Sequence, residues 1–112
     1  MTKKEFAKYL ERDLSSCYHC GRSGSTLVPQ HRIGRGMGGK HSKAELPSNI
    51  ITLCSEANGR LEFDAEFAEL GRSYGWKLSS SQDPRAVPVF EAKTGLYWYL
   101  DDRGYRGLFP LI

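Results

Sequence analysis

The chain has 112 residues, 39% hydrophobic and 26% charged, which is the composition of one ordinary globular domain and excludes wholesale disorder. No apolar run approaches the roughly 18 residues of a membrane-spanning helix, so we expect no membrane partner. No apolar stretch follows the N-terminal charges, so we expect no secretory signal and a cytoplasmic location. The formal net charge is only +3, but residues 1–60 carry ten Lys/Arg and five Asp/Glu, and no acidic residue lies between Asp13 and Glu45. This basic segment predicts a polyanion-binding face, although a solvated loop explains it equally well.

The first part of the chain predicts one helix, one strand and one long loop. Residues 3–13 carry apolar side chains at helical spacing. Residues 17–24 are typical of a turn, and residues 27–33 of a short edge strand, because Pro29 lacks a backbone donor. Four glycines within six positions exclude regular structure after this strand, so we expect a loop as far as about Pro47.

The second part predicts a strand, a long helix and a hairpin. Residues 48–53 are rich in β-branched side chains. Residues 55–74 have one apolar face, a serine suited to the N-cap and Gly75 as a stop, and so predict a single helix. Residues 86–92 and 96–100 flank a Lys-Thr-Gly turn and predict a β-hairpin.

The cysteines favour a metal site over a disulfide framework. Cys17 and Cys20 form a Cys-x-x-Cys motif, and Cys54 stands alone. An odd number of cysteines cannot pair completely within one chain, and a cytoplasmic location keeps thiols reduced. Three thiolates are one ligand short of a closed zinc site.

The order of these motifs resembles the HNH endonuclease family of the His-Asn-Asn type, and in particular small HNH proteins of actinobacterial phages. The matching residues, in chain order, are Cys17, Cys20, His31, Gly38, Gly39, Asn49, Cys54 and Asn58. The resemblance covers about residues 15–64. It implies an α+β protein with a ββα-metal core over residues 15–78, preceded by an N-terminal helix (1–14) and followed by a C-terminal hairpin (79–112) packed on the same domain.

The resemblance implies metal-dependent hydrolysis of DNA phosphodiester bonds. His31 would be the general base that activates water at the end of a strand facing the helix. Asn49 would tie down the glycine loop and orient the imidazole. Asn58, Glu62 and Gln30 would hold Mg²⁺ or Mn²⁺, which neutralises the leaving oxygen; Asn58 and Glu62 are four residues apart and share one helix face.

Two departures from the family pattern affect metal binding. Gln30 replaces the acidic or histidine ligand before the base, and a neutral amide binds a hard cation more weakly than a carboxylate does. Ala57 replaces the fourth zinc ligand. The structural zinc is then either lost or completed by an outside ligand. We expect its loss, with less than one zinc bound per chain and the cysteines packed as small apolar residues.

Four basic residues are predicted to contact DNA phosphates: Arg32, Arg35, Lys40 and Lys43. DNA is therefore the expected partner, together with phage proteins. Two alternatives stay open. One is a catalytically degenerate HNH-fold protein that binds DNA or assists phage assembly, which the changes at Gln30 and Ala57 favour. The other is a protein-interaction adaptor that uses the aromatic C-terminal hairpin.

Overall fold

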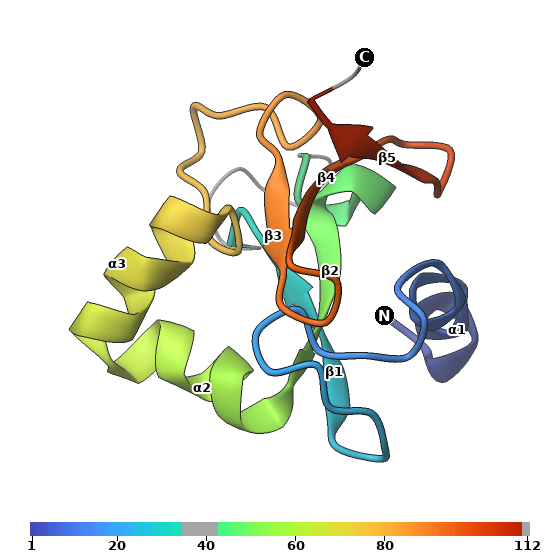
Figure 1. Cartoon of the computed structure of the whole chain (residues 1–112), viewed down its shortest axis with the longest axis horizontal. Helices are drawn as coiled ribbons and strands as arrows, with labels where there is room; N and C mark the ends of the chain where they lie inside the picture. The colour runs from blue at the N-terminus through green and yellow to red at the C-terminus, as the bar shows by residue number, and fades with distance from the viewer. Residues whose placement is uncertain (35–42, 111–112) are drawn as a thin grey trace.

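Three α-helices and two small antiparallel sheets form an α+β fold in the computed structural model, which describes residues 1–34 and 43–110 (Figure 1). None of the described helices is long and apolar enough to cross a membrane. The elements are α1 (Lys3–Arg12), β1 (Leu27–His31), the 3₁₀ helices η1 (Lys43–Glu45) and η2 (Pro47–Asn49), β2 (Ile50–Cys54), α2 (Ser55–Phe63), α3 (Ala65–Tyr74), β3 (Val89–Glu91), β4 (Leu96–Leu100) and β5 (Arg106–Phe109).

The first sheet is a two-stranded ribbon that leads directly into α2. Strands β1 and β2 pair antiparallel, from Leu27 opposite Cys54 to His31 opposite Ile50. Every residue of β2 is buried, because this strand lies between β1, α1 and α2. Both predicted strands are confirmed, with ends shifted by one or two residues. The register brings the end of β2, where α2 begins, to the opposite end of the ribbon from His31.

The prediction of a single helix over residues 55–74 is wrong, because the chain turns sharply at Asp64. This residue is extended (φ −116°, ψ 105°) and its carboxylate accepts the backbone N–H of Phe67, which caps α3. An aspartate that caps a new helix offers the backbone an alternative to continuing the old one. The predicted serine N-cap is also wrong: Cys54 occupies that position in α2. Gly75 ends α3 in the left-handed conformation, as predicted.

The C-terminal element is a three-stranded sheet instead of the predicted hairpin. Strands β3 and β4 pair as expected, and β5 adds to the other edge of β4, with Trp98 opposite Leu108. The guanidinium of Arg106 lies 4.1 Å from the Trp98 ring and 2.8 Å from a Glu91 carboxylate oxygen. Contacts of a charged residue therefore hold β5 in place, and for this reason the alternation of hydrophobic residues did not predict this strand.

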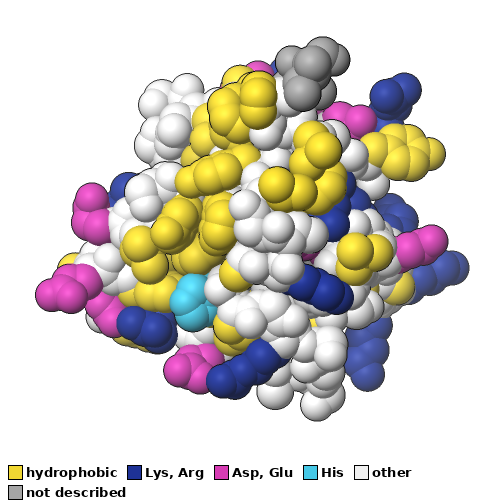
Figure 2. Space-filling view, in the orientation of Figure 1, with side chains coloured by type: hydrophobic (Ala, Val, Ile, Leu, Met, Phe, Trp, Pro, Cys, Tyr) yellow, Lys and Arg dark blue, Asp and Glu magenta, His cyan; other side chains and the backbone are white. Residues whose placement is uncertain are grey.

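One hydrophobic core joins the two sheets, α2 and α3. It contains Leu53 of β2, Leu61 of α2, Phe67 of α3, Val89 of β3 and Leu100 of β4. Figure 2 shows further hydrophobic side chains across the face between α3 and the β3–β4 pair. The C-terminal sheet thus packs on the same core as the β1–β2–α2 unit.

Candidate functional site

His31 ends β1 and lies beside a carboxylate that the sequence did not suggest. Its side chain is 13% exposed, and its Nε2 atom is 3.5 Å from Oε2 of Glu45 on η1. We expected His31 to face the helix, but the contact that the structure shows is with Glu45. The one feature of the sequence that could have drawn attention to Glu45 is that it is the first acidic residue after Asp13. Its carboxylate is therefore close enough to the imidazole to orient the ring.

Asn49 is fully buried and joins the two segments that flank the glycine-rich stretch. Its Oδ1 accepts the backbone N–H of Ile33 at 2.8 Å. Its Nδ2 donates to the carbonyls of Ile33 at 3.1 Å and Ala44 at 3.0 Å. One side chain therefore holds residues on both sides of the loop, which is the positional role predicted for it. Its influence on the imidazole stays a prediction.

Substituting Asn49 by alanine should lower the free energy of unfolding by about 2–4 kcal/mol, because three buried backbone groups lose their partner. Denaturant unfolding measures this loss. Asn58→Ala is the matched control, since Asn58 is half-buried and a comparable deletion there should cost about 1 kcal/mol or less. Equal losses for the two variants would contradict a special structural role for Asn49.

Gln30 and Asn58, both predicted metal ligands, are brought together as a hydrogen-bonded amide pair. Asn58 Nδ2 donates to Gln30 Oε1 at 2.7 Å. Gln30 is buried, and its Nε2 donates to the carbonyls of His31 and Trp76. Glu62 is exposed on α2. Among residues 1–34 and 43–110, the three cysteines are the only group of three or more His, Cys, Asp and Glu side chains close enough to share an ion. Within that part of the chain, neither Glu62 nor Glu45 belongs to a group of side chains that could share a metal ion.

The prediction that Arg32 contacts DNA is wrong, because its side chain is fully buried. Its guanidinium donates to four backbone carbonyls, those of Ser48, Gly75, Pro84 and Val87, at 2.7–2.9 Å. Burial lowers the pKa of Arg32 to about 10, so the group is still charged at neutral pH. Arg35 and Lys40 lie outside the described residues, as does the side chain of Lys43.

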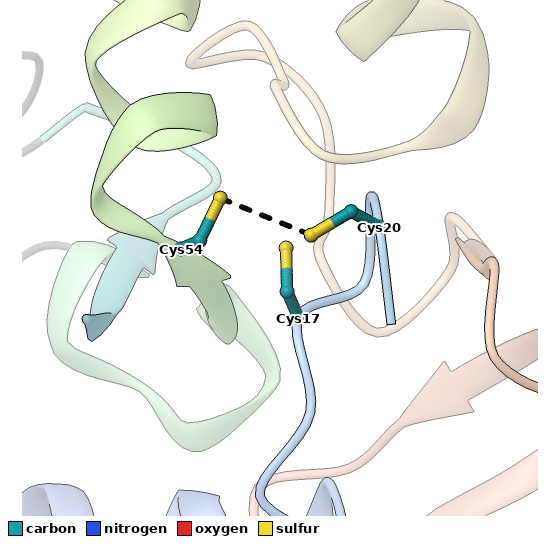
Figure 3. A group of neighbouring side chains, drawn as sticks. All are labelled: Cys17, Cys20 and Cys54. Atoms are coloured by element: carbon teal, nitrogen blue, oxygen red, sulfur yellow. Dashed lines mark hydrogen bonds between the residues drawn. The ribbon is translucent and has the colours of Figure 1, made fainter. Parts of the chain in front are cut away.

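The cysteines form the most compact group of metal-ligating atoms that the structure describes. Figure 3 shows Cys17 and Cys20 projecting from one turn towards Cys54, at the junction of β2 and α2. All three Sγ atoms lie within 4.8 Å of one another, and those of Cys20 and Cys54 are 4.0 Å apart. Tyr18 fixes the turn, because its N–H donates to the Thr52 carbonyl of β2.

The donor set suits a thiophilic metal such as zinc. Backbone N–H groups donate to two of the sulfurs: His19 to Cys17 at 3.3 Å and Ala57 to Cys54 at 3.4 Å. Burial raises the pKa of Cys17 to about 12. At Cys20, burial also raises the pKa, but hydrogen bonds from the Arg22 backbone and the neighbouring thiols outweigh it and leave the pKa lowered.

The three close cysteines can therefore hold a metal ion such as Zn²⁺. The expectation that all three are packed as small apolar residues is wrong for Cys20, which is exposed. Ala57 supplies no ligand atom from its side chain, as predicted from the sequence.

A small pocket of about 60 Å³ adjoins the cysteines. Its lining residues are His19, Cys20, Arg22, Cys54, Glu56, Ala57 and Arg60. The ring of His19 packs edge-on against Phe67 and Trp76, with centroids 5.0 and 5.4 Å away, and burial lowers its pKa. Its nitrogens lie outside the group formed by the three sulfurs. His41 lies outside the described residues.

Comparison of the chain with protein-family models, with curated proteins and with solved structures finds no match.

Proposed function

We propose that this chain is an HNH-type domain that hydrolyses phosphodiester bonds in DNA. The observation that carries the proposal is the β1–β2–α2 unit, in which Asn49 fastens the ends of the glycine-rich segment immediately after His31. The order of His31, Asn49 and Asn58 in this unit is that of the HNH family. The acid-free, basic stretch between Asp13 and Glu45 supports a polyanionic substrate.

His31 would act as the general base. An imidazole titrates near neutral pH and can take a proton from the attacking water. Glu45, 3.5 Å from Nε2, would hold the ring and stabilise the imidazolium that forms. The His31 side chain is 13% exposed, so part of it reaches the surface of the described residues.

The proposed divalent cofactor, Mg²⁺ or Mn²⁺, fits the described residues poorly. Gln30 and Asn58 offer two neutral amides, and the oxygen of Gln30 already accepts a hydrogen bond from Asn58. Mg²⁺ normally takes at least one carboxylate, and Glu62 is exposed on the surface of α2. We therefore derive no step through this ion.

Loss of His31 should abolish cleavage while the fold persists. The test is plasmid nicking with Mg²⁺, Mn²⁺ or EDTA by the natural chain and by His31→Ala, with thermal unfolding of both proteins as the check on folding. His19→Asn is the control, because His19 lies in the aromatic cluster beside α3. Equal nicking by the natural chain and His31→Ala would remove this mechanism.

A second candidate function is DNA binding without hydrolysis, and the Gln30–Asn58 hydrogen bond favours it. Asn58 donates one hydrogen bond to Gln30, so a neutral amide contact lies where the resemblance to the HNH family would place a metal ion. In that case the natural chain should bind plasmid with an affinity that falls steeply as salt rises, yet leave it intact under every metal condition. Binding that ignores salt would contradict both candidates.

A further inference from the structure

We propose that Cys17, Cys20 and Cys54 bind one Zn²⁺ ion whose fourth coordination position is open, and that this position takes a small exchangeable anionic donor, either hydroxide or a thiolate. The inference is independent of DNA cleavage, because it concerns the opposite end of the β1–β2 ribbon from His31. A closed site with four protein ligands has a purely structural role, whereas an open position lets the metal bind an outside ligand.

The three sulfurs already approach the spacing that zinc requires. Zn–S bonds of about 2.3 Å in a tetrahedron place the sulfurs about 3.8 Å apart. The Cys20–Cys54 distance is 4.0 Å, and no pair exceeds 4.8 Å. The N–H groups of His19 and Ala57 donate to the sulfurs of Cys17 and Cys54 and so fix the positions of these two sulfurs. Binding therefore needs only a small contraction of the group.

The fourth position has no side-chain ligand among the described residues. Ala57 follows Cys54 by three residues, the same spacing that separates Cys17 from Cys20, and its methyl group has no donor atom. No described His, Asp or Glu joins the three sulfurs. The pocket of about 60 Å³ lies at this place and is lined by Cys20, Cys54 and Ala57. A cavity needs roughly 10–15 Å³ of such volume to hold one water molecule, so the pocket has room for a small donor.

Charges of both signs surround the pocket. Zn²⁺ with three thiolates carries a net charge of −1. Two exposed guanidinium groups, Arg22 and Arg60, line the pocket and offset this charge, while Glu56 contributes one opposing carboxylate. Arg60 is held in place over the Phe67 ring at 4.1 Å and beside Asp64 at 3.3 Å. Asp64 pairs with Arg60 and Glu56 offsets a second cation, so the rim is close to neutral and an entering anion would be held chiefly by the zinc ion.

Cobalt substitution of the full chain tests the proposal, because Co²⁺ reports both its ligands and its coordination number in its absorption spectrum. We expect one Co²⁺ per chain with thiolate-to-metal charge-transfer bands, and d–d bands that shift as 2-mercaptoethanol is added. Ala57→Cys should close the site. Its spectrum should not respond to the added thiol, and it should hold zinc roughly tenfold or more tightly in competition with a chelating dye.

Ala57→Ser is the matched control, since serine is similar in size to cysteine but provides no thiolate. The Co²⁺ spectrum of this variant should respond to added thiol as the spectrum of the natural chain does. A natural chain whose spectrum ignores the thiol and matches that of Ala57→Cys would overturn the open position, because a protein ligand would already fill it. Binding of less than one Co²⁺ per chain, or binding unchanged in Cys54→Ser, would overturn the site itself.

Discussion

Substituting Arg32 by methionine should lower the free energy of unfolding by about 4 kcal/mol or more, one of the largest effects expected in this protein. The guanidinium is fully buried and donates to four backbone carbonyls. These carbonyls belong to Ser48 before β2, to Gly75 after α3, and to Pro84 and Val87 before β3. Removing the donor leaves four acceptors without it, at the place where three segments meet. Urea unfolding at neutral pH measures the loss.

Arg32→Lys should also be strongly destabilising, because an ammonium group cannot reproduce the planar fork that reaches four divergent carbonyls. Arg22→Met is the control. Because Arg22 is exposed, the free energy of unfolding of this variant should change by about 0.5 kcal/mol or less. A loss below about 1 kcal/mol for Arg32→Met would contradict the structural role of this residue. Such a small loss would also make Arg32 a candidate for contact with DNA again.

Replacing Asp13 by alanine should lower the free energy of unfolding by about 3–5 kcal/mol, because it leaves a buried cation without its partner. Asp13 is fully buried and accepts two hydrogen bonds from Arg12, at 2.8 and 2.9 Å. It also accepts from the hydroxyls of Tyr18 at 2.6 Å and Thr52 at 2.9 Å. One carboxylate thus ties α1 to the cysteine turn and to β2, and its loss leaves four donor groups on three side chains without their acceptor. Thermal or urea unfolding measures the effect.

Glu11→Ala is the control for Asp13, since Glu11 is an exposed neighbour on α1 and its removal should change stability little. The double variant Arg12→Met with Asp13→Ala should lose less stability than the sum of the single variants, because the cation and its partner leave together. Additive losses would show that the Arg12–Asp13 pair is not the source of the effect.

Local patterns were enough to predict much of the β1–β2–α2 unit. Residues 27–31 and 50–54 have the composition of strands, and Gly75 provides the stop that ends α3. The Cys-x-x-Cys turn was also predictable, and the pairing of Leu27 with Cys54 then brings the third cysteine to it. The resemblance to the HNH family implied that Asn49 ties down the loop, and an asparagine side chain can both donate to and accept from the backbone.

Other features depended on contacts between residues far apart in the chain. A basic residue in an acid-free segment suggests exposure, yet Arg32 is buried because four carbonyls, 16 to 55 residues away, converge on it. The contact of Glu45 with His31 and the amide pair of Gln30 and Asn58 likewise form only when η1 and α2 pack against β1.

The break at Asp64 has a local cause. The aspartate caps α3, and this cap competes with an otherwise continuous helical pattern.

The sequence by itself therefore identified the candidate site residues: one histidine at a predicted strand end, one asparagine and three cysteines. The tertiary structure decided which of them meet and what surrounds them. Apolar periodicity and turn residues act over a few positions and can be recognised directly. Buried charges and the pocket beside the cysteines depend on the three-dimensional convergence of backbone carbonyls, guanidinium groups and sulfurs, for which no local pattern exists.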